Sequence, residues 1–195
     1  VDKWCTAPHQ LEDIYNFEDA LLVALMLMTL LKHADRVKIG CLAQLVNVIA
    51  PIMTENGGKA WAQTIFYPYM FASRFGRGTT LKPIIKSDTY ETSYNCTVPY
   101  VEASVIQNSE KRELIVFAVN RSLDEDMELN LVLEGFDTAS LFEHVELFNE
   151  DLKAVNTAEN SDTITPTKRE TDSTPSANQT IKLKKHSWNM LRFNY

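Results

Sequence analysis

Apolar residues are arranged differently in the two parts of the chain. In the N-terminal part they form long runs: Ala20–Leu31 is almost entirely apolar, and so is Val37–Val46. Further on they alternate with polar residues, most regularly in MELNLVL (127–133). Runs of the first kind indicate a buried helix and a strand covered on both faces, whereas alternation indicates strands with one buried face. The pattern therefore predicts an α/β part over 1–78 and an antiparallel β part over 79–195.

The first helix is predicted at Phe17–His33. Asn16 is a favourable N-cap, and Glu18 and Asp19 place negative charge in the first turn, where the helix dipole favours it. Lys32 places a positive charge in the last turn. The apolar run is shorter than the roughly 20 residues that a membrane span requires. We therefore expect a helix buried in protein on more than one side, and no membrane association.

A strand and a second helix are expected to follow. The run Val37–Val46 predicts a buried strand, Asn56-Gly57-Gly58 predicts a turn, and a helix is expected from about Lys59 to Phe75, kinked by Pro68. Helix, buried strand and helix form the repeating unit of an α/β barrel or of a doubly wound fold. Because one strand cannot form a sheet, residues 1–78 are expected to be an incomplete part of a larger α/β domain.

Residues 79–195 predict a β-sandwich of jelly-roll type. Short alternating segments recur, two of them joined by a polar turn of hairpin composition. The expected strands are 101–107, 113–120, 127–133, 141–148, 180–185 and 188–195. Between them, residues 153–179 are rich in Ser, Thr, Asn and Asp and are expected to form a long mobile loop.

Charge and cysteine content exclude several classes of function. The net charge of −7 falls entirely on residues 79–195, and neither part carries the basic stripe that nucleic-acid binding requires. Cys5, Cys41 and Cys96 are too few and too scattered for a disulfide framework or a metal site. Cys41 is expected to be a small buried side chain. We predict reduced thiols, a cytoplasmic location, and no metal or other cofactor.

Two amides interrupt the apolar segment VKIGCLAQLVNVIAPI (37–52), namely Gln44 and Asn47. In an α/β barrel the C-terminal ends of the strands face the active site. Gln44 is placed there and could bind a sugar hydroxyl or a catalytic carboxylate; it could equally satisfy loop backbone. For Asn47 the structural interpretation is favoured.

Other candidate residues have structural explanations. The adjacent acids Glu12-Asp13 and Glu18-Asp19 cannot present two carboxylates to one sugar, as glycoside hydrolysis requires, and the second pair suits a helix start. The four histidines lack metal-ligand spacing, and serine-nucleophile and phosphate-loop motifs are absent from the sequence. The aromatic residues of 61–75 and Trp188 are expected to pack in a core or between domains.

Several long segments, in order, resemble the C-terminal part of the α-L-arabinofuranosidases of glycoside hydrolase family 51. The segments are LEDIYNFEDALL (11–22), KHADRVKIGCLAQLVNVIAPIMTE (32–55), AWAQTIFYPYMFAS (60–73), GRG (76–78) and FAVNR (117–121). The resemblance implies the last part of a (β/α)8 barrel followed by a jelly-roll sandwich. Phe17–His33 would be the seventh barrel helix, Val37–Gln44 the eighth strand and Ala60–Phe75 the eighth helix.

The resemblance also implies a function. Family members remove terminal arabinofuranosyl groups from arabinoxylan, arabinan and oligosaccharides with retention of configuration. Their two catalytic glutamates lie in motifs that precede this part and do not occur here, so the chain alone is expected to be inactive. By this resemblance Gln44 corresponds to a residue of the sugar subsite, and Trp4, on the loop after the seventh strand, is expected to border the cleft.

The expected partners are the remainder of the barrel, an arabinofuranosyl-containing saccharide and, because family members are often hexamers, further copies of the same protein. Two alternatives stay open from sequence. The sandwich could be a non-catalytic carbohydrate-binding module that uses exposed aromatics, or it could serve only structure and oligomerisation.

Overall fold

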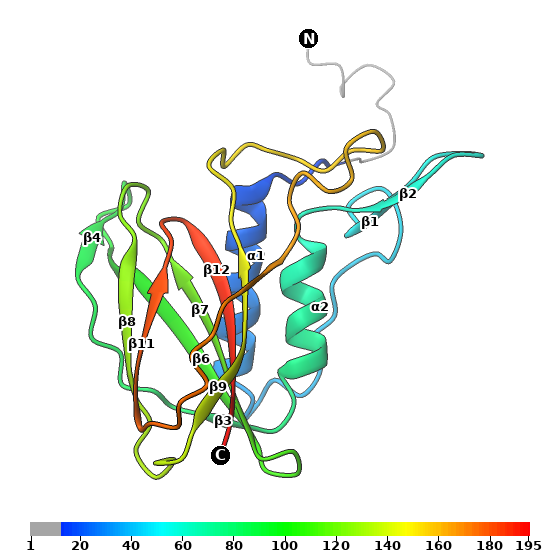
Figure 1. Cartoon of the computed structure of the whole chain (residues 1–195). Helices are drawn as coiled ribbons and strands as arrows, with labels where there is room; N and C mark the ends of the chain where they lie inside the picture. Colours follow the sequence, from blue (N-terminus) through cyan, green and yellow to red (C-terminus); the bar gives the residue numbers. More distant parts are fainter. Residues whose placement is uncertain (1–12) are drawn as a thin grey trace.

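A computed structural model describes residues 13–195 of the chain, and Figure 1 shows their arrangement. Two helices and twelve strands are formed within these residues. In chain order they are α1 (Phe17–Lys32), β1 (Ile52–Thr54), β2 (Ala60–Ala62), α2 (Phe66–Phe75), β3 (Thr79–Leu81), β4 (Thr89–Glu91), β5 (Thr97–Pro99), β6 (Val101–Asn108), β7 (Glu113–Asn120), β8 (Met127–Val132), β9 (Ser140–Leu147), β10 (Thr167–Arg169), β11 (Asn178–Leu183) and β12 (Ser187–Asn194).

The main sheet contains six antiparallel strands in the order β10-β9-β12-β7-β6-β3. The predicted hairpin is confirmed as β6 and β7, in which Val101 pairs with Asn120 and Asn108 pairs with Glu113. A second antiparallel pair, β11-β8, faces this sheet, and β4-β5 and β1-β2 form two small hairpins. The predicted antiparallel sandwich is therefore confirmed.

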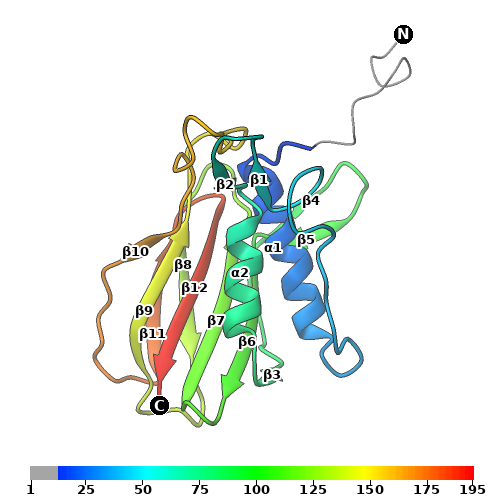
Figure 2. The ribbon, with the colours of Figure 1, turned by 90° about the vertical axis from the view of Figure 1, so that its right-hand side faces the viewer.

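The six-stranded sheet has a separate apolar core on each face. One core joins α1 to the sheet through residues such as Phe17, Met28, Phe117 and Trp188. The other core lies between the main sheet and β8-β11 and includes Phe193. Figures 1 and 2 show the resulting layers, with both helices on one side of the sheet and β8 and β11 on the other. The expected packing role of Trp188 is confirmed, since its side chain is fully buried.

Helix α1 begins and ends where the sequence predicts. The side chain of Asn16 accepts a hydrogen bond from the backbone N–H of Asp19, and the Asp19 carboxylate accepts one from the backbone N–H of Asn16. His33 is the C-cap. Only one face of the helix is buried, however, because Leu22 and Met26 are 55% and 61% exposed. Within this chain, the expected burial on more than one side is wrong.

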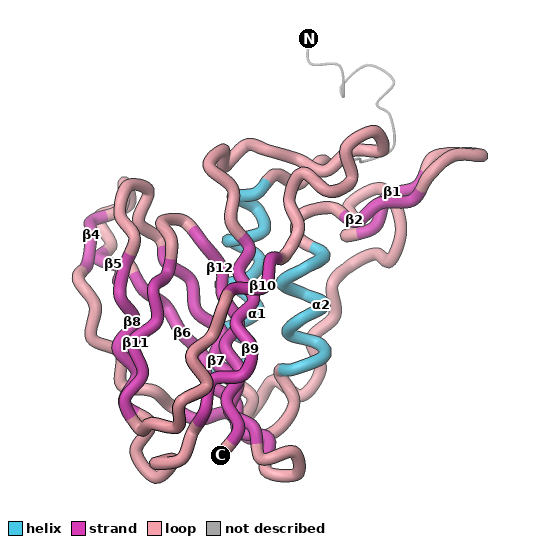
Figure 3. The backbone as a smooth tube through the Cα atoms, in the orientation of Figure 1, coloured by secondary structure: helices cyan, strands magenta, loops and turns pink. Residues whose placement is uncertain are grey.

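The predicted strand Val37–Val46 (the Val37–Gln44 of the family resemblance) is not formed. Residues 37–45 have no regular secondary structure, and Figure 3 draws the segment between α1 and β1 as loop. Only Val46 makes an isolated bridge, parallel to Ile52. A parallel strand needs neighbours on which to place its N–H and C=O groups. The described residues offer this segment no such neighbours, so its backbone stays open.

The second helix is shorter than predicted. Residues 60–62 belong to β2, which pairs with β1 across the expected turn at 56–58, and α2 begins only at Phe66. Pro68 therefore lies in the first turn, where a missing N–H leaves no intrahelical bond unmade. The expected kink is absent because the proline is at the start of the helix rather than inside it.

Residues 153–179 are more ordered than a mobile loop. Asn156 accepts a hydrogen bond from the Ile164 backbone N–H (2.8 Å) and donates to the Ile164 carbonyl (2.9 Å), and the Ile164 side chain is fully buried in the core below α1. Farther on, Thr167–Arg169 form the edge strand β10. The polar composition reflects side chains that bond to local backbone, which periodicity does not reveal.

Candidate functional site

Gln44 lies in the exposed segment between α1 and β1, and its side chain is open to solvent. The neighbouring Cys41 is exposed as well, so the expectation that it is a small buried side chain is wrong. Both residues were predicted on a buried strand. Because that strand is not formed, the alternation of strand side chains does not place Gln44 against a neighbouring residue. Its side-chain amide is exposed to solvent and accessible to a partner outside the described residues.

Asn47 has a structural role, as the sequence favoured. Its backbone is left-handed, with φ 60°. The side-chain oxygen accepts a hydrogen bond from the Thr54 backbone N–H (2.7 Å), and the side-chain nitrogen donates to the Thr54 hydroxyl (2.9 Å). Asparagine is one of the few residues that adopt this conformation readily. Asn47 therefore shapes the turn between the Gln44 segment and β1.

A third amide, Gln63, holds this region together and was not singled out from sequence. It is 1% exposed. Its oxygen accepts from the Tyr15 backbone N–H (2.9 Å), and its nitrogen donates to the carbonyls of Ala50 (2.8 Å) and Asp13 (3.2 Å). Gln63 thus ties the entry to α1 to the turn before β1. The only sequence signal was a polar residue just before an aromatic helix.

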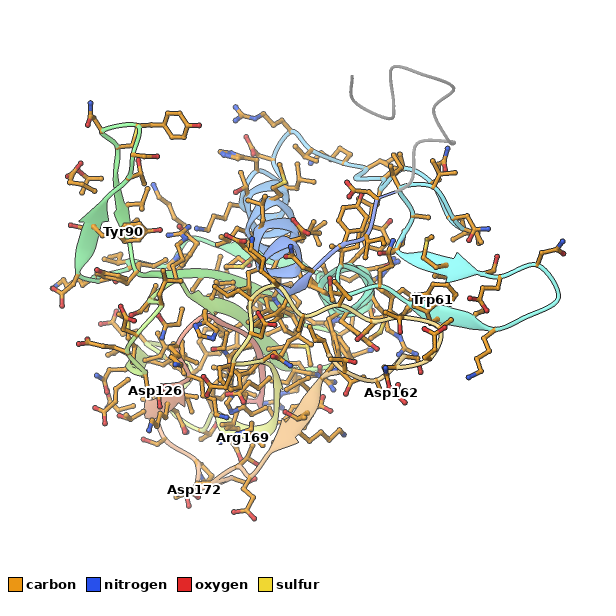
Figure 4. The ribbon with its side chains drawn as sticks, turned by 90° about the horizontal axis from the view of Figure 1, so that it is seen from above. Trp61, Tyr90, Asp126, Asp162, Arg169 and Asp172 are labelled. Carbon is orange, nitrogen blue, oxygen red and sulfur yellow. The ribbon has the colours of Figure 1, made fainter. Side chains whose placement is uncertain are left out.

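The β1-β2 hairpin and helix α2 carry the aromatic cluster. Figure 4 labels Trp61 on the hairpin that projects from the molecule. Tyr67, Phe71 and Phe75, in contrast, pack against the core beneath α1, and the Phe71 ring lies 5.3 Å from that of Trp188. The predicted packing role is confirmed for these three residues of α2.

The acidic side chains near α1 do not form a catalytic pair. Asp19 completes the helix cap, and Glu18 is paired with Lys153. The backbone N–H of Asp13 donates to the Val48 carbonyl at 2.8 Å. Glu12 and Trp4 lie outside the described residues, as does Cys5. Glu18 and Asp19 therefore act at the helix start, as predicted from sequence.

Two tyrosines beside this region are held in the neutral form. Burial raises the pKa of Tyr15 above its ordinary value, and the charges of Asp13 and Asp19 raise it further. Burial also raises the pKa of Tyr67, with a smaller contribution from Asp162. The Tyr15 hydroxyl donates to the Ile49 carbonyl at 3.1 Å. Neither phenol is prepared to act as a base near neutral pH.

Histidines contribute to packing and capping. His144 lies on β9 and bonds to Asn189, while buried His186 stacks on Phe148. Among residues 13–195, no group of three or more His, Cys, Asp or Glu side chains could hold a metal ion. Over the same residues, no helix is both long enough and apolar enough to cross a membrane.

An apolar groove lies next to the Gln44 segment. It has a volume of about 470 Å³ and is lined by side chains of α1, of α2 and of residues 37–40, including Leu27, Leu30, Ile39 and Tyr69. Together with the exposed face of α1, it forms an apolar surface on the side of the helices away from the sheet. Such a surface on a protein usually contacts another protein or another part of the same chain.

Comparison with known families shows which family the chain belongs to. Residues 2–187 match the family described as the alpha-L-arabinofuranosidase C-terminal domain. The chain belongs to this family. It is 51% identical over 192 residues, 98% of its length, to the intracellular exo-alpha-(1->5)-L-arabinofuranosidase 1 of Bacillus subtilis. It is also 44% identical over 166 residues, 84% of its length, to an exo-alpha-(1->6)-L-arabinofuranosidase of Bifidobacterium longum.

Solved arabinofuranosidase structures share the fold. A family 51 alpha-L-arabinofuranosidase from Bifidobacterium longum superimposes with a TM-score of 0.88 at 38% identity, over 96% of this chain and 36% of that one. The Thermotoga maritima enzyme superimposes with a TM-score of 0.82 at 21% identity, over 96% of this chain and 40% of that one, which shows the fold. The chain spans 38% of the length of the Bacillus subtilis relative and 31% of the Bifidobacterium relative.

Proposed function

We propose that this chain is the C-terminal part of a retaining α-L-arabinofuranosidase that removes terminal arabinofuranosyl groups from arabinan, arabinoxylan and their oligosaccharides. The observation that carries the proposal is the match of residues 2–187 to the arabinofuranosidase C-terminal family. Relatives that match nearly the whole chain are named intracellular arabinofuranosidases, which also supports a cytoplasmic location.

The division of the chain is proposed at about residue 78, and the exposed apolar surface supports the proposal that the first part is incomplete by itself. Residues 1–78 would complete a (β/α)8 barrel, whose other strands would pair with residues 37–44 and cover the exposed face of α1. Residues 79–195 would form the accessory sandwich. The relatives are long enough to contain the remaining barrel, since this chain spans 38% of the length of the Bacillus subtilis enzyme.

Within that barrel, Gln44 would reach the sugar site. The free amide and its place near the C-terminal end of the segment 37–44 support this role. An amide cannot exchange a proton near neutral pH, so Gln44 would bind a sugar hydroxyl or orient a catalytic carboxylate rather than act as acid or base. Trp4 would border the same cleft.

The test is arabinose release from an aryl α-L-arabinofuranoside by the full-length enzyme, with Gln44→Ala compared to the wild type. We expect kcat/KM to fall by roughly tenfold or more, because a hydrogen bond made in the transition state is lost. Lys38→Ala is the matched control: it lies in the same segment, at the end opposite the active-site face, and should retain wild-type kinetics.

The 195-residue chain should release no arabinose, since its sequence lacks both catalytic glutamate motifs of the family. Unchanged kinetics for folded Gln44→Ala would remove Gln44 from the sugar site. Arabinose release by the 195-residue chain would contradict the proposal that both catalytic glutamates lie outside it.

The alternative of a carbohydrate-binding module that uses exposed aromatics receives little support. Three large aromatic side chains of the long sandwich strands, Phe117, Trp188 and Phe193, are at most 1% exposed, and the strongly exposed ring of Tyr94, at 87%, lies alone in the β4-β5 turn among the exposed large hydrophobic side chains of the described sandwich. Buried rings cannot stack on a sugar, and one exposed ring is not a stacking surface formed by several aromatics.

A further inference from the structure

A polar cavity opens on the face of the main sheet opposite the two helices. Its volume is about 400 Å³, and it lies between β9, β10, β11 and the segment 170–176. Leu141 and Ile181 line it, and both also belong to the core between the main sheet and β8-β11. Figure 4 shows Arg169 and Asp172 at this edge of the molecule. The volume falls in the range of about 300–1,000 Å³ that small-molecule sites occupy.

The register of β9 and β10 brings three functional groups together. Arg169 pairs directly with His144, and Thr167 pairs with Glu146. Because side chains alternate, His144 and Glu146 lie on the same face of β9. They are 5% and 2% exposed, and Arg169 Nη1 lies 3.7 Å from Glu146 Oε2.

The hydrogen-bond chain behind His144 determines which ring nitrogen carries the proton. The Ser187 hydroxyl donates to the Lys184 carbonyl (2.7 Å), so Ser187 Oγ accepts from Asn189 Nδ2 (2.9 Å). The oxygen of Asn189 then faces His144, whose Nε2 must donate to it (2.9 Å). The pKa of His144 is lowered, mainly by burial, which favours the neutral ring. Nδ1 is therefore left as a hydrogen-bond acceptor.

Donors and acceptors in this cluster remain available to a ligand. Among the described residues, neither His144 Nδ1 nor the Arg169 guanidinium has a hydrogen-bond partner, since the contact of Arg169 with Glu146 is longer than a hydrogen bond. Oε1 of Glu146 also has no partner among these residues, but it is buried behind Arg169 and does not line the cavity.

The residues that line the cavity carry two positive charges, Arg169 and Lys182, and two negative charges, Glu170 and Asp172, so the lining is neutral overall. The carboxylate of Glu146 neutralises Arg169, and Lys182 is paired with Asp126 at 2.9 Å. The Asp172 carboxylate accepts hydrogen bonds from Thr174, which lower its pKa. The carboxylates would repel a phosphate, and the Arg169 guanidinium would repel a metal cation. A neutral group that both donates and accepts hydrogen bonds fits better.

We propose that this cavity binds a small neutral polyhydroxyl compound of the size of one or two sugar units. One hydroxyl donates to His144 Nδ1 while it or its neighbour accepts from Arg169, and Leu141 and Ile181 contact the C–H groups of the ring. The site would be a saccharide site of the sandwich. It goes beyond the proposed function and does not depend on it, because it requires no hydrolysis.

The experiment follows the imidazole nitrogens of His144 by NMR in the 195-residue chain during titration with L-arabinose, and with inorganic phosphate in parallel. Self-association through the helices would leave the cavity free, since it lies on the other face of the sheet. Arg169→Met is the test variant. Lys168→Met is the matched control, because Lys168 is the adjacent residue, 80% exposed and paired with Glu143 on the opposite face.

We expect L-arabinose to shift the His144 signals saturably, Arg169→Met to weaken binding by about tenfold, and Lys168→Met to leave it within about twofold of the wild type. The absence of a saturable shift with the pentose would overturn the proposal. Saturable binding of phosphate instead of the pentose would also overturn it, as would equal effects of the two substitutions. The titration detects binding and not arabinose release, so failure of this proposal is distinguishable from failure of the proposed hydrolase function.

Discussion

At the scale of single residues, Glu102 links helix α1 to the main sheet. Its carboxylate on β6 pairs with Lys32, the last residue of α1, and lies 3.3 Å from Arg121 Nη2. Burial disfavours the charged form of Glu102, but the hydrogen bonds and charges of Lys32 and Arg121 outweigh it, so the pKa is lowered from its ordinary value of 4.5. Only a carboxylate in this position satisfies both cations.

This link predicts a pH-dependent contribution to stability. A folded-state pKa below the unfolded value means that the unfolded chain binds more protons, so the contribution is present above about pH 4.5 and is lost as the pH falls through the lowered folded pKa. Glu102→Gln should reduce the free energy of unfolding at neutral pH by on the order of 1 kcal/mol. The difference from the wild type should shrink in acid.

Chemical denaturation across this pH range measures the effect. Glu128→Gln, on the exposed side of β8, is the control and should follow the wild type at each pH. A Glu102→Gln difference that does not change with pH would show that packing, rather than the ion pairs, is lost.

At the scale of elements, Gly78 permits the passage from α2 into β3. Its φ is 140°, and a Cβ atom there would fall on the carbonyl oxygen of Gln107, on the strand that pairs with β3. Gly57, in the β1-β2 turn, also has a positive φ (69°), but has no heavy atom within 4 Å of a Cβ position. A comparison of the two positions therefore separates the cost of a positive φ, which both have, from the cost of a steric clash, which only Gly78 would have.

We expect Gly78→Ala to destabilise the chain by more than Gly57→Ala. The second substitution introduces only left-handed strain of about 1–2 kcal/mol, whereas the first adds a clash with backbone that cannot move without breaking the β3-β6 pairing. Thermal or urea unfolding of both variants measures the difference. Equal losses would mean that the strand pair opens easily to accept a methyl group.

At the scale of the whole molecule, the surface of the helices away from the sheet exposes large apolar side chains. Leu22 and Met26 on α1 are more than half exposed, as are Ile39 and Leu45 in the following segment, at 83% and 75%. In the proposed full-length enzyme the remaining barrel would bury them. In the 195-residue chain these side chains are exposed to solvent.

The 195-residue chain should therefore self-associate and bind hydrophobic dyes. Replacing Met26 by Lys should weaken both effects, because it places a charge in the apolar face. Val132→Lys is the control, since Val132 is 66% exposed but lies on β8, away from the helices. Sedimentation measures the association. A monomeric wild-type chain with no dye binding would contradict the covering of this surface by a barrel.

The elements that sequence predicted well are those whose signals are local. The cap at Asn16, the alternation of β8 and the hairpin of β6 and β7 depend on neighbours within a few residues. The strand at 37–46 failed because a parallel strand is stabilised only by partners that the described residues do not include. The predicted kink at Pro68 was also wrong because of a pairing between separate segments. Residues 60–62 pair with β1, so α2 begins only at Phe66 and Pro68 lies in its first turn.

By itself, the sequence determined the antiparallel sandwich, the limits of α1, the structural role of Asn47 and the resemblance to the arabinofuranosidases. Only the tertiary structure decided which face of α1 is buried, that Gln63 joins distant backbone segments, and that His144 and Arg169 face one cavity. The physical reason is the separation along the sequence between the residues that interact. Caps and alternation act between residues close in sequence, whereas burial and hydrogen bonding of a side chain depend on which distant strands the fold places beside it.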